Sequence, residues 1–307
     1  MRRNNAASIL TDTADAWSAL RALPRPERRR IAACAGWILS GTVAFAQPLV
    51  GLVKYASESP LNSHTPLIPL VTGYLLFIQR KSLPAATHTS LAGTLLMVAL
   101  GVAALSVVTV NSGSLSPNDV LSLQILAYVA YLAAGGFLFL GRHWMAQAAF
   151  PMSFLVFMVP LPDVVVMRLE DALVLASADV AAWMLKATGT PVLRNGTIFT
   201  LPTITLEVAR ECSGIRSSWV LFITSLVASH MFLKSPWRSF VLVAFVIPLG
   251  ILRNGFRILV ISLLCVNVGP HMIDSVIHHR GGPIFFALSL PPLFLLLWWL
   301  RRRENRS

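Results

Sequence analysis

Long apolar stretches alternate with short polar hinges along most of this chain. A helix that crosses a lipid bilayer needs about 20 apolar residues, and eight stretches approach or meet that requirement. They are Ile31–Val53, Pro66–Gln79, Ser90–Val110, Val120–Leu140, Trp144–Leu161, Ile215–Leu233, Ser239–Leu252 and Pro283–Leu300. The second is short, and the chain stays apolar from residue 254 to 269. The pattern predicts an all-α membrane protein with about eight transmembrane helices.

One apolar stretch does not fit a simple transmembrane helix. Asp163–Lys186 is apolar overall but contains Arg168, Glu170, Asp171 and Asp179. A charge at the centre of a bilayer costs several kcal/mol. We therefore expect an amphipathic helix that lies in, or re-enters, the interface on the outward-facing side of the membrane.

A short segment further on has a different period. In Thr203–Val208, apolar Ile204, Leu206 and Val208 alternate with polar residues. A period of two is typical of a half-buried strand. This strand would lead the chain directly to Cys212.

The basic residues indicate an orientation in the membrane. Lys and Arg follow the second, fourth and sixth apolar stretches and cluster before the first and after the last; the hinge residues are Arg80, Lys81, Arg142, Lys234 and Arg238. Such residues concentrate on the cytoplasmic side. We expect residues 1–30 to form a cytoplasmic tail without a cleavable signal peptide, 31–300 the membrane domain and 301–307 a basic cytoplasmic tail.

Composition supports the same class. The chain is 55% hydrophobic and only 12% charged, whereas soluble domains contain about 25% charged residues. The net charge of +12 comes mostly from the tails and hinges, and no basic patch is interleaved with aromatic residues. A nucleic-acid partner is therefore not expected. Membrane lipids are the expected surroundings, in a bacterial inner membrane.

Cys212 is the first candidate for chemistry. The chain has three cysteines, Cys34, Cys212 and Cys265, too few for a disulfide framework. Cys212 lies just before the apolar stretch that begins at Ile215, on the side predicted to face outward. A helix N-terminus favours an anion, and the thiolate is the reactive form of cysteine.

Two further residue types are predicted to reach the same side. Arg257 follows Arg238 by 19 residues, about 28 Å along a helix, which is nearly the thickness of the hydrocarbon core. An arginine there can stabilise an oxyanion or bind a carboxylate. A cysteine nucleophile also needs a base. Four histidines are placed outside by the same topology: His64, His271, His278 and His279.

Each of these residues also fits a plainer role. Cysteines in membrane proteins often serve packing, which is how we interpret Cys34 and Cys265. Arg253 and Arg257 can extend toward lipid head groups, and the His278–His279 pair can anchor the chain at the interface. Convergence of three residue types on one side favours a reactive site.

Three blocks of sequence at these residues resemble the signatures of the exosortase/archaeosortase family. They are Glu211-Cys-Ser-Gly-Ile-Arg-Ser217, Asn254-Gly-Phe-Arg-Ile258 and His278-His-Arg-Gly-Gly282. Supporting blocks are similar as well: Asn62–Pro69, Phe150–Pro162 and Arg194-Asn-Gly196. The blocks occur in the family's order over about residues 30 to 300.

The resemblance implies an intramembrane cysteine peptidase and transpeptidase. Such an enzyme acts on exported proteins that end in a sorting signal, made of a short PEP-type motif, a transmembrane helix and a basic tail. It cleaves near the motif and transfers the new C-terminus to an acceptor at the cell surface.

The resemblance also implies the roles of particular residues. Cys212 is the nucleophile, Arg257 the arginine and His278 the histidine. His278 has Gly282 four residues later, as in the family pattern, but His279 remains an alternative. The residues implied to bind substrate or support the site are Glu211, Ser213, Gly214, Arg216, Arg253, Asn254, His279 and Gly282. No cofactor and no metal are expected.

Two other functions remain open from the residues. The chain could be a polytopic transporter or export component. Arg253, Arg257 and His278 would then bind an anionic lipid-linked ligand at the outer face. A metalloprotease would use His271, His278 and His279 as ligands. The HExxH pattern of such enzymes is absent from the sequence, which disfavours this function.

Overall fold

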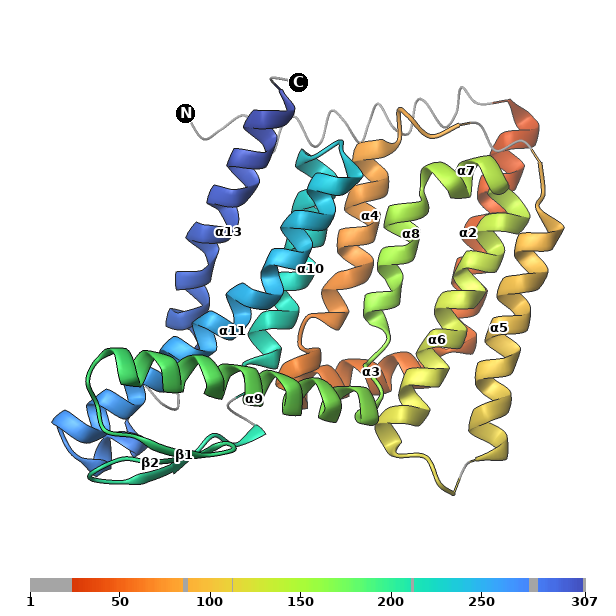
Figure 1. The fold of residues 1–307 in the computed structure, drawn as a ribbon. Coiled ribbons are helices and arrows are strands. Elements are labelled where there is room, and N and C mark those ends of the chain that lie inside the picture. Colours follow the sequence, from red (N-terminus) through yellow and green to blue (C-terminus); the bar gives the residue numbers. More distant parts are fainter. Residues whose placement is uncertain (1–23, 85–87, 112, 211–212, 276–280, 306–307) are drawn as a thin grey trace, which may run out of the picture. The chain divides into compact units, whose positions relative to one another are not determined.

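The structure is a computed structural model that describes residues 24–84, 88–111, 113–210, 213–275 and 281–305. The chain divides into two compact units, residues 1–162 and 163–307. Figure 1 labels the helices and strands of both units. Each unit is described by itself below.

The first unit is helical throughout its described part. Its elements are α2 (Arg25–Ala44), α3 (Ala46–Glu58), the 3-10 turns η1 (Pro60–Asn62) and η2 (Thr65–Leu67), α4 (Ile68–Gln79), α5 (Leu91–Val110), α6 (Pro117–Gly135), the π-helical turn η3 (Gly136–Leu140), α7 (Arg142–Gln147), α8 (Ala149–Phe154) and η4 (Leu155–Met158). Helix α5 packs along α6, and α2 packs against α6 and η3. At that contact the Trp37 ring stacks on Tyr131 with centroids 4.3 Å apart.

Prolines break two of the expected transmembrane helices in this unit. The stretch expected as one span over Ile31–Val53 is two helices bent by 69° at Phe45. Pro48 cannot donate to Ala44, and its ring collides with that carbonyl, so the first helix ends at Ala44. In the same way, the ring of Pro151 collides with the carbonyl of Gln147, where α7 ends. The expected span Trp144–Leu161 is therefore a series of short helices.

The second unit combines four long helices with a small sheet. Its elements are α9 (Asp163–Ala187), β1 (Leu193–Asn195), β2 (Ile198–Thr200), β3 (Thr205–Glu207), α10 (Ile215–Phe232), α11 (Pro236–Asn267), the 3-10 turn η6 (Pro270–Asp274) and α13 (Gly282–Glu304). Helices α10, α11 and α13 pack against one another, and α9 packs along α11.

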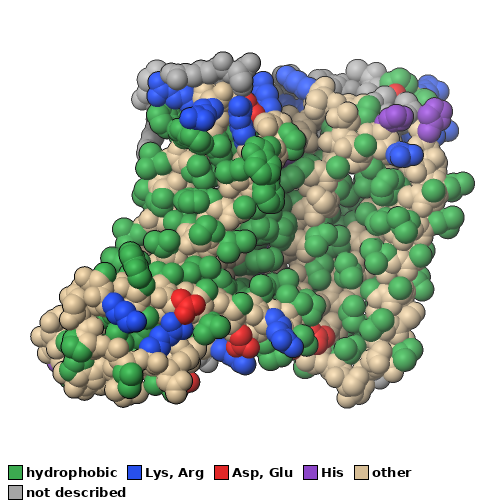
Figure 2. Space-filling model, in the orientation of Figure 1, with side chains coloured by type: hydrophobic (Ala, Val, Ile, Leu, Met, Phe, Trp, Pro, Cys, Tyr) green, Lys and Arg blue, Asp and Glu red, His purple; other side chains and the backbone are tan. Residues whose placement is uncertain are grey.

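The expected amphipathic helix is present as α9. Its buried residues repeat at helical spacing and form a single face: Val174, Ser177, Ala178, Ala181, Ala182 and Leu185. This face meets α11 at Gly255, where an added Cβ would lie 2.7 Å from a methyl carbon of Val180. Figure 2 shows red and blue charged groups along the exposed side of α9, among the green hydrophobic groups that cover much of the visible face. That α9 lies at a membrane interface stays a prediction.

The alternating segment before Cys212 is part of an antiparallel sheet with the order β1-β2-β3. Leu206 and Val208 are buried, while Thr205 and Glu207 are exposed, as the alternation predicted. The sheet packs its Phe199 and Leu206 side chains into a core shared with α9 and α11. Its first hairpin was not predicted, although Gly196, with φ +61°, is a typical turn residue there.

The count of eight transmembrane helices is not confirmed. Among the described residues, five helices are long and apolar enough to cross a bilayer, or up to seven if two pairs of consecutive helices each count as one span. Helix α4 has 12 residues, about 18 Å, which is too short. The expected span Ser239–Leu252 and the apolar residues after it form one helix, α11, of 32 residues.

The far end of α13 is fixed to the turn between α10 and α11. The Glu304 carboxylate accepts hydrogen bonds from the backbone N–H groups of Lys234 (2.9 Å) and Ser235 (2.7 Å). It also lies 3.5 Å from the Arg238 guanidinium. This carboxylate also lies near the start of α11, where the positive end of the helix dipole stabilises a negative charge.

Removing this carboxylate should loosen the bundle of α10, α11 and α13. We expect Glu304→Ala to lower the melting temperature, because it leaves two backbone donors without their acceptor. Thermal unfolding of the detergent-solubilised protein measures the change. Glu58→Ala, at an exposed carboxylate in α3, is the control and should leave the melting temperature unchanged. Equal melting temperatures for the two variants would contradict the role of Glu304.

Candidate active site

A cleft of about 460 Å³ opens within the second unit. Its walls come from α9, from the segment that leads into α10, from α10 and α11, and from the start of α13. The lining residues are Glu170, Arg210, Ser213, Gly214, Ile215, Arg216, Ser217, Val220, Arg257, Gly282, Pro283 and Phe286. Five of the predicted site residues are among them.

The residues on either side of the candidate nucleophile line this cleft. Glu211 and Cys212 lie outside the described residues, but Arg210 and Ser213 border them and both face the cleft. The Ser213 N–H donates to the Arg210 carbonyl at 2.9 Å. Arg210 and Ser213 are therefore close together at the edge of the cleft.

Gly214 connects this block to α10 through a left-handed backbone conformation, with φ +69°. Helix α10 starts at Ile215, as the sequence predicted. The Gly214 carbonyl accepts from the N–H of Ser218 at 3.0 Å and from the Arg253 guanidinium at 3.1 Å. A Cβ at this position would meet Arg253 at 3.0 Å and Asn254 at 3.1 Å. Both the conformation and the space require glycine here.

Arg253 is a buried support for this turn, with 8% of its surface exposed. Its Nη2 donates to the Gly214 carbonyl and, at 3.2 Å, to the Ser218 hydroxyl. Its Nη1 is buried, and no acceptor for it lies within the described part of the chain. Arg253 thus holds α10 against α11 and is not among the residues that line the cleft. Asn254 is buried beside it, with 2% exposed.

Arg257 lies one helical turn after Arg253 and is half-buried. It lines the cleft and also a second, smaller pocket. Because a single helix carries Arg238 and Arg257, the helical path assumed from the sequence is confirmed. The depth of Arg257 in a membrane stays a prediction.

The last residue of the histidine block, Gly282, lines the cleft at the start of α13. His278 and His279 lie outside the described residues, whereas Gly282 and Pro283 line the cleft. Among the described lining residues there is no histidine. His64 belongs to the first unit, where burial lowers its pKa and a hydrogen bond to the Leu61 carbonyl partly opposes that shift. His271 is exposed in η6.

The charged residues among the described lining of the cleft are three arginines, Arg210, Arg216 and Arg257, and one glutamate, Glu170. Arg210 forms a two-pronged ion pair with Asp171 of α9: Nε donates to Oδ1 at 2.7 Å and Nη2 to Oδ2 at 3.2 Å. Arg216 is exposed at the first turn of α10. Among described residues, no group of three His, Cys, Asp or Glu side chains could hold a metal ion.

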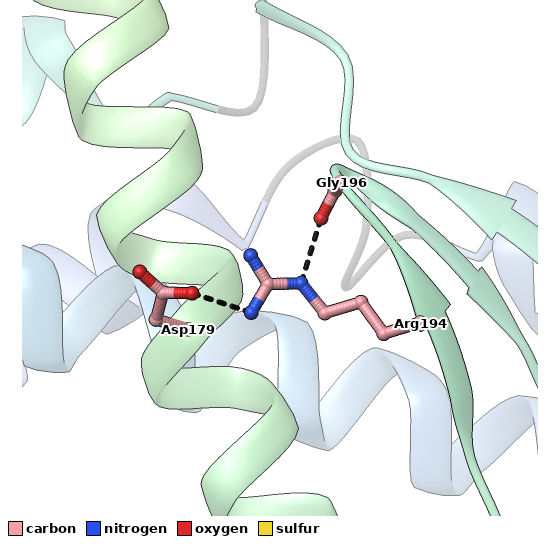
Figure 3. A network of polar contacts seen from close by, with 3 residues as sticks. All are labelled: Asp179, Arg194 and Gly196. Atoms are coloured by element: carbon pink, nitrogen blue, oxygen red, sulfur yellow. Dashed lines mark hydrogen bonds and ion pairs between the residues drawn. The ribbon is translucent and has the colours of Figure 1, made fainter.

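A second ion pair joins α9 to the sheet that leads into the cleft. Arg194 Nη1 donates to Asp179 Oδ1 at 2.5 Å, and its Nε donates to the Gly196 carbonyl at 2.6 Å. Figure 3 shows the guanidinium between the helix and the turn of the hairpin. Asp171 and Asp179 are eight residues apart on α9. Asp179 pairs with Arg194 of β1, and Asp171 pairs with Arg210, which follows β3 in the chain.

Comparison with known proteins identifies the family. A family model described as transmembrane exosortase (Exosortase_EpsH) matches residues 56–303, which include all three signature blocks. The chain belongs to the exosortase family. It is therefore a membrane protein of a family of transmembrane cysteine transpeptidases. No curated protein matches the chain, and no solved structure matches it.

Sequence reasoning did not identify three contributors to this exosortase cleft. Glu170 and Arg210 line it, and Asp171 holds Arg210. Their signal was present in the charges of the α9 segment, which were interpreted only as evidence against a transmembrane helix. Acidic residues on an otherwise apolar helix also predict ion pairs with basic residues elsewhere in the chain. Arg210, which directly precedes the cysteine block, was one such candidate.

We expect Gly214→Ala to destabilise the turn before α10. A residue with a Cβ in the left-handed region costs about 1–2 kcal/mol, and here the Cβ also presses on Arg253 and Asn254. The melting temperature of the purified protein should fall by several degrees. Gly73→Ala is the matched control, because a Cβ at Gly73 of α4 meets nothing within 4 Å. A Gly214→Ala protein as stable as Gly73→Ala would contradict the account of this turn.

Proposed function

We propose that this exosortase-family protein is an intramembrane cysteine peptidase and transpeptidase with Cys212 as its nucleophile. The observation that supports it is the cleft: Arg257 lines it, and so do the residues that border the cysteine and histidine blocks. Three segments far apart in the sequence supply the borders of one cavity. Such a constellation of nucleophile, base and oxyanion-stabilising group is what acyl transfer needs.

The proposed reaction begins with the Cys212 thiolate attacking the carbonyl carbon of a substrate peptide bond. The carbonyl oxygen becomes an oxyanion that the Arg257 guanidinium stabilises. When the carbon–nitrogen bond breaks, His278, or His279 in its place, gives a proton to the leaving amine. The acyl group remains on Cys212 as a thioester.

In the second half, a nucleophile of the acceptor, or water, attacks the thioester carbon. The histidine takes the proton of that nucleophile, and the carbon–sulfur bond breaks to return the thiolate. The proposed substrates are exported proteins whose C-terminal signal consists of a PEP-type motif, a transmembrane helix and a basic tail. We place both termini of the enzyme in the cytoplasm and the cleft at the outer face of a bacterial inner membrane.

The surrounding residues have supporting roles in this proposal. Arg253 and Gly214 fix the turn after Cys212, and Asn254 packs beneath them. Ser213, Arg216 and Gly282 line the cleft and would contact the substrate. Glu211 adjoins the nucleophile in the chain.

A second function is favoured by the excess of arginine in the cleft. The described lining includes Arg210, Arg216 and Arg257 and one carboxylate, that of Glu170, and a transporter or export component could hold an anionic lipid-linked ligand at such a site. Such a protein would not need the thiol of Cys212. The cysteine variants below therefore separate the two functions.

We expect Cys212→Ala and Cys212→Ser to abolish processing of a co-expressed, tagged exported protein that carries the sorting signal. Loss of the thiolate removes the group that forms the thioester. The size of the tagged protein on an immunoblot measures processing, and the amount of enzyme in the membrane fraction controls for folding. Cys34→Ala, at a buried cysteine of α2, should process normally. Normal processing by Cys212→Ala would refute the proposed function.

Arg257 gives a second test of the same mechanism. Removing one oxyanion-stabilising donor costs about 10²–10³ in rate, and we expect a loss of that order in processing by Arg257→Ala. Arg257→Lys keeps the charge without the planar fork and should recover only part of the rate. Arg168→Ala, at an exposed arginine of α9, is the control. An unchanged rate in Arg257→Ala would exclude Arg257 from the reaction.

A further inference from the structure

Strand β3 forms an edge of the sheet, and half of its backbone groups point away from β2. The Val208 N–H donates to the Thr197 carbonyl at 3.0 Å, and Leu206 lies opposite Phe199. Because backbone groups alternate between the two edges of a strand, those of Thr205 and Glu207 face outward. No described segment pairs with this edge. An open edge is a template for another extended chain.

An apolar pocket of about 130 Å³ follows the same strand. One wall is the four consecutive residues 206–209, so the pocket runs along the strand and does not lie under one face of it. The other lining residues are Ile273 of η6 and, from α11, the apolar Ile258 and Ile261 together with Asn254, Arg257 and Ser262. A pocket of this size and character has room for one aliphatic side chain.

The pocket adjoins the candidate active site. Arg257 lines both the pocket and the cleft, and strand β3 continues through Ala209 of the pocket to Arg210 of the cleft. A polypeptide that runs along the edge of β3 is therefore guided toward Arg257 and the cysteine block.

We propose that the polypeptide substrate binds in an extended conformation as an added strand beside β3, with one apolar side chain in the pocket. This inference rests on the proposed function. Backbone hydrogen bonds to Thr205 and Glu207 would hold the segment whatever its sequence, and the pocket would select a side chain, as in other cases of strand addition. The segment that binds in this way is the one next to the scissile bond, because that segment must reach Arg257.

Proline at Glu207 tests the outward backbone donor. Glu207→Pro removes an N–H that is not needed for pairing with β2, and proline is tolerated at the outer side of an edge strand. Glu207→Ala removes the same carboxylate but keeps the N–H. We expect processing of the tagged exported protein to fall about tenfold in Glu207→Pro relative to Glu207→Ala, the loss expected for one good hydrogen bond. Equal rates in the two variants, with equal amounts of enzyme in the membrane, would overturn the proposal.

Crosslinking keeps the proposal testable if the proline variant does not fold. A photoreactive benzoylphenylalanine replaces Glu207, or as control Leu193, which is exposed on the opposite edge of the sheet. In the Cys212→Ala background, irradiation should join the tagged substrate to position 207 and not to position 193. Adducts at both positions or at neither, or an adduct of two enzyme copies through position 207, would overturn the proposal.

The two proposals fail in different ways. If Cys212→Ala still processes substrate, the cysteine mechanism is wrong whatever position 207 shows. If Cys212→Ala is inactive but the crosslink at position 207 is missing, the chemistry stands and the substrate binds elsewhere. Ile261→Phe, which fills the pocket, should in addition lower processing while leaving the Glu207 hydrogen bond in place.

Discussion

The buried guanidinium of Arg253 holds together the part of the molecule on which the candidate active site depends. A buried charge is expensive unless it is hydrogen-bonded, and Nη2 of Arg253 donates to the Gly214 carbonyl and the Ser218 hydroxyl. This contact fixes the start of α10 against the middle of α11. Since Cys212 precedes α10 and Arg257 follows Arg253 by one turn, the same contact sets how the two blocks approach each other.

Around that contact, the second unit supports the cleft from several directions. Helix α9 packs its small residues on α11, and its Asp179 and Asp171 hold Arg194 and Arg210, so the sheet and the residue before the cysteine block are both tied to α9. At the other end of the helices, Glu304 joins α13 to the turn before α11. The lining of the cleft is thus held by side chains that are far apart in the sequence.

The sequence was sufficient where the signal was local. The helices starting at Leu91, Ile215 and Gly282 follow from the length of the apolar stretches. Helix α9 follows from the charges in its apolar segment, and the strand at Leu206 from its period of two. The helix breaks at Phe45 and Ala148 were missed because hydropathy averages over Pro48 and Pro151, whose effect depends on one backbone carbonyl. In the site, the residue types and their order were visible in the sequence. The support by Arg253 and the pairing of Asp171 with Arg210 were not, because partners 39 residues apart meet only after α9, α10 and α11 have packed.

The length of α11 has a consequence for the setting in which the protein works. At 32 residues it is about 48 Å long, against a hydrocarbon thickness of about 30 Å, and only the 14 residues from Ser239 to Leu252 separate Arg238 from Arg253. These cover about 21 Å. If α11 crosses the membrane in the predicted orientation, hydrophobic mismatch would bring the acyl chains up to the level of Arg253 and toward Arg257. A thicker, more ordered bilayer would then draw the arginine end of the cleft toward hydrocarbon, and lipid composition would tune the electrostatics of the cleft.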